Sequence, residues 1–161
     1  MKSNFTDALL YASRLCSATE HCRQDIEEKI RRFELDSEEE QELFIRLEKD
    51  GFLDEKRYTN AYVNDKFQLN KWGSIKIKSY LKHKKIPADV IDEALSGLNE
   101  TRYTKTLMEL MQRKDKSIRC TNSLERRAKL YRFALGRGFE VPLVNTCLNQ
   151  FLREHVERDE E

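Results

Sequence analysis

Lysine and arginine side chains gathered in two segments are the residues of this chain best suited to chemistry, because both side chains bind phosphates and carboxylates. Seven lysines and no carboxylate occur from Lys66 to Ala88, and nine basic residues accompany two acidic ones from Arg113 to Arg137. From Glu20 to Glu55, fourteen carboxylates outnumber six basic side chains, although the whole chain has a net charge of only +1. This segregation predicts a partner of opposite charge for each block.

The spacing of the first basic segment predicts a binding surface on one helix. We expect Ile77, Tyr80 and Leu81 to face inward. One flank of that helix then carries three lysines at positions i, i+4 and i+7, namely Lys78, Lys82 and Lys85. The basic side chains that we predict to contact a partner are Lys71, Lys76, Lys78, Lys82, Lys85, Arg126, Arg127, Lys129 and Arg132. A solvated helix face whose charges bind nothing explains the same pattern about equally well.

Trp72 lies between Lys71 and Gly73, at the start of the same helix. An indole beside lysines could stack on a nucleic-acid base. A tryptophan that opens a helix can equally fill the gap between two packed repeats, and we favour this packing role.

Motifs for catalysis are absent from the sequence. It has no GxxxxGK[ST] loop, GxGxxG, HExxH or GxSxG motif, and His21, His83 and His155 each stand alone in a charged helical context. The adjacent carboxylates Asp54 and Glu55 follow a glycine where a helix should begin, and the helix dipole explains them without a metal. We therefore expect a protein that is not an enzyme and that has no metal and no cofactor.

The four cysteines are Cys16, Cys22, Cys120 and Cys147, and no CxxC pair or zinc-ligand spacing joins them. Reduced thiols and a cytoplasmic location are expected, with Cys147 as a small core residue. No apolar window approaches the length of a membrane span, and no signal peptide precedes residue 20. We expect a monomer, because the acidic segment from 154 to 161 has the character of a solvated cap.

The helices that position these side chains follow a repeat, since residues 72–95 align with residues 125–148 without a gap. Apolar positions coincide throughout, and they still coincide across the turn between two helices, where Ile86 meets Phe139. Similar starts, Arg57-Tyr58-Thr59 and Arg102-Tyr103-Thr104, extend both copies toward the N-terminus. A stacked array of helical repeats has this signature.

A third and weaker copy upstream completes the expected fold, which is all-α with three tandem three-helix repeats in an elongated, curved array. The predicted repeats span residues 1–53, 54–98 and 99–156, and an acidic tail spans 157–161. The predicted helices span 6–16, 18–33, 38–50, 54–70, 73–85, 87–98, 100–114, 122–137 and 141–156.

Helix ends are predicted from residue types with known preferences. Capping boxes at Ser17 with Glu20 and at Ser37 with Glu40 should start two helices. Pro87 and Pro142 should lie near the first turns of two others. Three glycines should leave helices with positive φ, and they are Gly51, Gly73 and Gly138.

Four stretches in this order resemble the RecX family, whose members regulate the RecA recombinase. They are residues 8–14 (Ala-Leu-Leu-Tyr-Ala-Ser-Arg), residues 51–58 (Gly-Phe-Leu-Asp-Glu-Lys-Arg-Tyr), Gly73 with Lys76 and Ile77, and residues 137–139 (Arg-Gly-Phe). The resemblance covers most of the chain and implies an elongated protein of three three-helix repeats. It also implies binding in the groove of RecA nucleoprotein filaments, which limits recombinase, ATPase and co-protease activity in DNA repair, recombination and the SOS response.

Three functions remain open at this point. The first is a regulator of RecA filaments, for which the nine basic residues named above would form the filament-binding or DNA-binding surface. The second is a stand-alone binder of single- or double-stranded DNA that acts through its basic repeats. The third is a helical adaptor for another protein.

Overall fold

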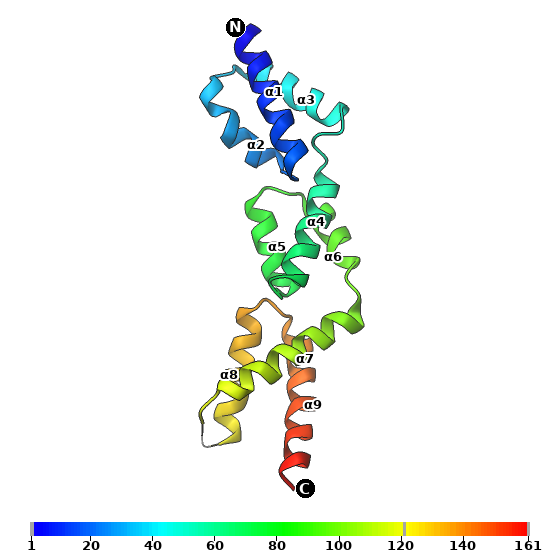
Figure 1. Ribbon diagram of the computed structural model, residues 1–161. Helices are drawn as coiled ribbons and strands as arrows, with labels where there is room; N and C mark the ends of the chain where they lie inside the picture. Colours follow the sequence, from blue (N-terminus) through cyan, green and yellow to red (C-terminus); the bar gives the residue numbers. More distant parts are fainter. Residues whose placement is uncertain (1, 121, 161) are drawn as a thin grey trace. The chain divides into compact units, whose positions relative to one another are not determined.

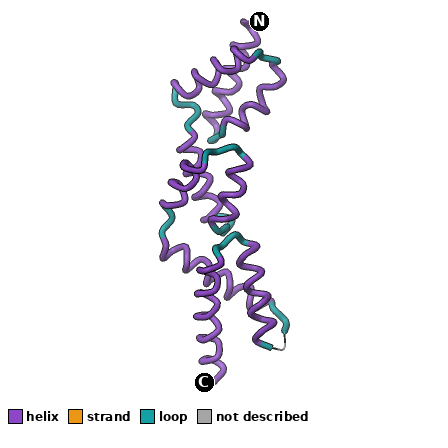
Figure 2. Tube along the Cα trace, turned by 180° about the vertical axis from the view of Figure 1, so that it is seen from behind, coloured by secondary structure: helices purple, strands orange, loops and turns teal. Residues whose placement is uncertain are grey.

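The computed structural model describes residues 2–120 and 122–160, within which every regular element is a helix (Figure 1). The α-helices are α1 (Lys2–Ala18), α2 (Arg23–Ile30), α3 (Ser37–Lys49), α4 (Glu55–Gln68), α5 (Ser74–His83), α6 (Ala88–Ser96), α7 (Glu100–Ser117), α8 (Ser123–Gly136) and α9 (Val141–Glu160), and a 3-10 turn, η1 (Arg31–Phe33), follows α2. Loops connect them (Figure 2). The predicted all-α fold of three successive three-helix repeats is confirmed. None of the described helices has the length and apolar content needed to cross a bilayer.

The second and third repeats end their middle helices with the same hydrogen-bonded turn. Lys85 and Gly138 both take left-handed φ values, 60° and 94°. The next amide, from Ile86 or Phe139, donates to the carbonyl five residues back at 3.2 Å and 3.3 Å, respectively. Because these bonds satisfy helix carbonyls that otherwise lack partners, the turn lets Ile86 and Phe139 enter the core at equivalent positions.

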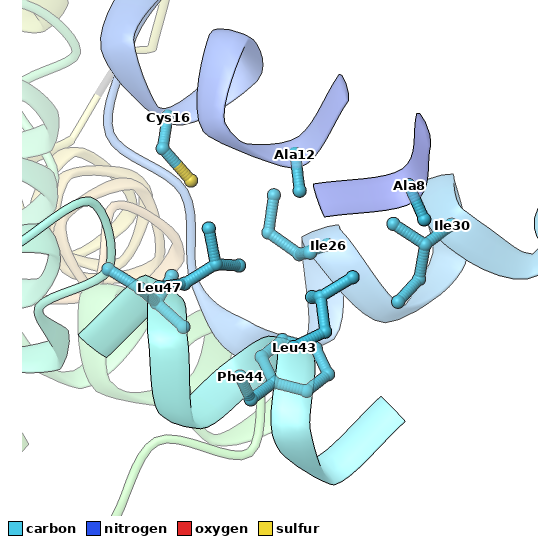
Figure 3. Close-up of a cluster of buried hydrophobic side chains, with 9 residues drawn as sticks. Ala8, Ala12, Cys16, Ile26, Ile30, Leu43, Phe44 and Leu47 are labelled. Carbon is cyan, nitrogen blue, oxygen red and sulfur yellow. The ribbon is translucent and has the colours of Figure 1, made fainter. Parts of the chain in front are cut away.

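The chain divides into two compact units. The N-terminal unit contains the residues up to Val63 together with Leu81–Ala94. Its core joins α1, α2 and α3, as Figure 3 shows, and includes Ala8, Ala12, Cys16, Ile26, Ile30, Leu43, Phe44, Leu47 and Leu53. The alanines on α1 allow close approach of the other two helices, whose larger side chains fill the space.

An ion pair ties Lys84, the residue after α5, to the first turn of α2 within the N-terminal unit. The Lys84 Nζ atom donates to Asp25 Oδ1 at 2.6 Å. Asp25 also accepts from the amide of Cys22, the residue that caps α2. Burial alone would raise the pKa of Asp25, but the hydrogen bonds from Lys84 and Cys22 outweigh it and lower the pKa below its usual value.

The C-terminal unit contains Asn64–Tyr80 and the residues from Leu95 onward. Two glycines bring the start of α5 and the end of α8 into backbone contact. The Gly73 amide donates to the Arg137 carbonyl at 2.7 Å, and the Ile75 amide donates to the Gly138 carbonyl at 3.0 Å. A Cβ atom on Gly73 would lie only 2.3 Å from the Gly138 carbonyl carbon, so this contact requires glycine.

A buried tyrosine completes this contact on the side of α7. The Tyr103 hydroxyl donates to Glu140 at 2.8 Å and accepts from the Ser74 amide at 2.9 Å. Its ring packs against Phe67 and Phe139, with centroid distances of 5.6 Å and 5.0 Å. Burial raises the pKa of Tyr103, which keeps the hydroxyl protonated as a donor.

Both predicted capping boxes are misplaced. Helix α1 continues to Ala18 and α2 starts only at Arg23, because the Ser17 hydroxyl donates to the Ser13 carbonyl as in a helix interior. Helix α3 is capped by Asp36, not Ser37, and the side chain of Glu39 reaches back to the Asp36 amide. An aspartate one residue earlier gives an equally good cap and satisfies the first amides.

Gly73 and Tyr80 also differ from the predictions. Gly51 and Gly138 have the predicted positive φ, but Gly73 does not, and Lys71 takes the left-handed conformation instead. The Tyr80 side chain, predicted to face inward, is 49% exposed because it packs on Trp72 outside the core. Cys147 is buried, as predicted.

Candidate functional site

The basic residues of and around α5 differ in their exposure and in their position relative to the helix. Lys82 is exposed on the last turn of α5, and Lys78 is half-buried. The helix ends at His83, so Lys85, exposed and left-handed, lies beyond the helical flank on which it was predicted. Lys71 is half-buried just before the helix, and Lys76 faces the indole of Trp72. Of the three lysines predicted to share one flank of the helix, only Lys78 and Lys82 therefore lie on α5.

A basic groove lies within the C-terminal unit, where α7 ends and α8 passes it. It encloses about 580 Å³ and is lined by Lys114, Ser117, Ile118, Arg119, Lys129, Arg132 and Phe133. Four of these seven residues carry positive charge and none carries a carboxylate. We call this set the basic groove.

Helical spacing places the basic groove residues of α8 on one face. Lys129, Arg132 and Phe133 occupy positions i, i+3 and i+4 of α8, which point in the same direction. The Lys129 ammonium donates to the Arg119 carbonyl at 3.2 Å, which holds the loop after α7 against α8. The Lys114 ammonium lies 5.5 Å from the ring centroid of Phe133 and covers it from the side of α7.

Two of the predicted arginines on α8 do not line the basic groove. Arg126 forms an ion pair with Asp115 of α7, with the two side chains 24% and 12% exposed. This ion pair links α7 to α8, and the hydrogen bond to Asp115 raises the pKa of Arg126. Arg127 lines a separate cavity of about 810 Å³ bordered by α9.

The structure thus brings Lys129 and Arg132 together in the basic groove and adds two residues that the sequence analysis did not select. Lys114 and Arg119 belong to the second basic segment, which gave the only signal for them. The sequence alone does not show that the end of α7 packs beside α8, which is what brings them next to Lys129 and Arg132.

The basic groove has the chemistry of an anion-binding surface. Arg132 and Arg119 can each present two parallel N–H donors to a phosphate or carboxylate, and lysines add point charges beside them. Among the described residues no group of three histidine, cysteine or acidic side chains is arranged to hold a metal ion. The groove can therefore bind an anionic partner through hydrogen bonds and charge.

Two family profiles match successive repeats of the chain. Residues 54–95 match RecX, second three-helix domain, and residues 100–148 match RecX, third three-helix domain. These ranges correspond to α4–α6 and to α7 through the first half of α9.

Curated relatives and solved structures agree with these profiles. Regulatory protein RecX of Clostridium acetobutylicum is 31% identical over 157 residues, which cover 92% of this chain and 72% of that protein. Regulatory protein RecX of Clostridium botulinum strain Alaska E43 is 34% identical over 106 residues, which cover 65% of this chain and 49% of that protein. The aligned part is thus about half the length of the Clostridium botulinum relatives.

The fold also resembles that of a solved RecX structure. The crystal structure of RecX from Lactobacillus salivarius superposes with a TM-score of 0.86 at 17% identity, covering 94% of this chain and 98% of that one. At 17% identity this superposition supports the fold alone. The assignment to a family depends on the domain profiles and the curated relatives. Two successive domain profiles and a relative aligned over most of both chains show that this protein belongs to the RecX family.

Proposed function

We propose that this protein binds RecA nucleoprotein filaments in the cytoplasm and restrains the recombinase, ATPase and co-protease activities of RecA, and so modulates DNA repair and recombination. The observation that carries the proposal is the match of two successive repeats to the second and third RecX domains. Curated relatives bear the name regulatory protein, which fits a protein that acts on another and not on a small substrate.

The charges of the C-terminal unit support this proposal physically. A RecA nucleoprotein filament contains DNA, so it carries phosphates as well as protein carboxylates. The basic groove presents four cations with no carboxylate among its lining residues, and complementary potentials speed association and fix orientation. We propose Lys129 and Arg132, with Lys114 and Arg119, as filament contacts of the C-terminal unit. The exposed Lys82 and Lys85, which belong to the N-terminal unit, are proposed as contacts of their own.

The test is RecA-dependent ATP hydrolysis on single-stranded DNA with increasing amounts of the purified protein. We expect a dose-dependent fall in the hydrolysis rate, because a regulator bound along the filament limits its growth and turnover. A hydrolysis rate that stays constant while the added protein is shown to be folded would contradict the proposed function.

A second candidate function is favoured by the same groove. Four cations that line one groove could neutralise phosphates of free DNA without RecA. In that case the protein binds labelled single- or double-stranded DNA alone, and the logarithm of affinity falls steeply and linearly with the logarithm of salt concentration. DNA binding that appears only when RecA is present instead supports the first function.

A further inference from the structure

A pair of aromatic rings at the start of α5 is a surface feature outside the basic groove. Trp72 and Tyr80 lie with ring centroids 4.8 Å apart, tilted by 43°. Tyr80 is 49% exposed and Trp72 is half-buried, so the Tyr80 ring reaches the surface and the indole lies beneath it at the edge of the core. Both rings belong to the C-terminal unit.

Lysines surround the rings and make the surface attractive to a polyanion. The ammonium groups of Lys66 and Lys76 lie 4.9 Å and 4.5 Å from the centroid of Trp72. Lys76 and Tyr80 are one turn apart on one face of α5, and Trp72, two residues before the helix, lies against both side chains. Rings flanked by cations are the combination that binds single-stranded nucleic acid, in which bases stack and phosphates are neutralised.

The third repeat lacks this aromatic pair at the aligned positions. In the repeat alignment, Trp72, Lys76 and Tyr80 correspond to Glu125, Lys129 and Phe133. Glu125 lies in the first turn of α8, is 45% exposed and pairs with Lys129 at 3.2 Å, whereas Trp72 lies two residues before α5. The second repeat replaces a surface carboxylate with a tryptophan and thereby gains an aromatic pair.

We infer that Trp72 and Tyr80, flanked by Lys66 and Lys76, form a stacking site for bases of single-stranded DNA. The site is separate from the basic groove and does not depend on the proposed action on RecA. One or two bases would stack on the exposed ring of Tyr80, next to Trp72, while the lysines contact the adjoining phosphates.

The experiment uses the fact that Trp72 is the only tryptophan in the chain. The full-length protein is titrated with an oligothymidylate and, separately, with an abasic oligomer of equal length that has the same phosphates and no bases. Binding is followed by anisotropy of a label on the DNA, and stacking is followed by Trp72 emission. We expect oligothymidylate to quench the emission and the abasic oligomer to bind without quenching it.

Substitutions at Tyr80 provide the matched controls. Tyr80→Leu should weaken oligothymidylate binding about fivefold or more, the low end of what a lost base stack costs, and leave abasic binding unchanged. Tyr80→Phe, which keeps the ring, should bind within twofold of the parent. Circular dichroism checks that both variants keep their helices.

Three results would overturn the inference. They are equal quenching by both oligomers, an equal effect of Tyr80→Leu on both, and no binding of either oligomer. Any of these would mean that the exposed rings do not take bases, and a protein partner would then be the remaining occupant.

Discussion

The ion pair of Lys84 and Asp25 makes one part of the stability of the N-terminal unit depend on pH. The pKa of Asp25 is lowered in the folded chain, so as the pH falls the unfolded chain takes up its proton first. The stabilisation is therefore complete above the pKa of an unfolded aspartate, roughly 4, and is lost as the pH falls through the lower folded value. Lys84 is 40% exposed, so solvent screening limits the gain.

Replacing Asp25 should expose this pH dependence. At neutral pH Asp25→Asn should lower the free energy of unfolding by about 1 kcal/mol, and the difference from the parent should shrink below a pH of roughly 4. Urea unfolding at a series of pH values measures both quantities. Asp7→Asn, which changes an exposed carboxylate on α1, is the control and should have a small effect at every pH. A penalty for Asp25→Asn that does not vary with pH would refute the assignment.

Prediction of single residues from the sequence worked best where packing alone decides. Cys147 was predicted as a small core residue because it aligns with Ala94, and both are buried. Arg126 shows the limit of such reasoning. Its partner Asp115 lies on another helix, and the pairing depends on how α7 and α8 pack. The sequence could count the positive charges but could not show which of them form ion pairs between helices, as Arg126 does, and which line a groove, as Arg132 does.

At the scale of elements, the contact of Gly73 with Gly138 joins α5 to the turn after α8 through backbone hydrogen bonds. No flexible side chain can move aside to admit a Cβ atom on Gly73, because the nearest atoms are backbone. Gly73→Ala should therefore lower the free energy of unfolding by about 3 kcal/mol. Urea unfolding followed by circular dichroism measures the change.

Gly136 supplies the matched control for that substitution. It is the last residue of α8, and a Cβ atom there would meet no atom within 4 Å. Gly136→Ala should be neutral or should stabilise the protein by up to about 1 kcal/mol through helix propensity. Equal effects at Gly73 and Gly136 would show that the close backbone contact does not form.

The helices themselves were largely predictable, because the repeat alignment extends across turns. Lys85 and Gly138 make equivalent turns, so the agreement of Ile86 with Phe139 reflected real geometry. The starts of α2 and α3 were less predictable. Asp36 and Ser37 are adjacent residues that both cap helices well, and residue preference alone does not choose between them.

At the scale of the whole molecule, each unit has its own charge. The fourteen carboxylates from Glu20 to Glu55 all lie in the N-terminal unit, and the basic groove lies in the C-terminal unit. An anionic partner should therefore be recognised first by the third repeat. The net charge of +1 conceals this difference, which only the distribution along the chain and the groove lining reveal.

Reversing two charges in the basic groove tests whether the third repeat recognises the anionic partner. Lys129→Glu with Arg132→Glu should raise the concentration needed for half-maximal inhibition of RecA by about tenfold, which corresponds to about 1.4 kcal/mol. The control is Lys29→Glu with Lys49→Glu, two exposed lysines of the N-terminal unit whose reversal changes the net charge by the same amount. It should inhibit like the parent.

The most direct measurement is the rate of ATP hydrolysis by RecA on single-stranded DNA, titrated with the parent protein, the groove variant and the control variant. We predict that the parent and the control lower the rate over the same concentration range, and that the groove variant needs about tenfold more protein. A groove variant as potent as the parent would contradict the placement of the contact. A parent protein that leaves the rate unchanged would contradict the regulatory function itself.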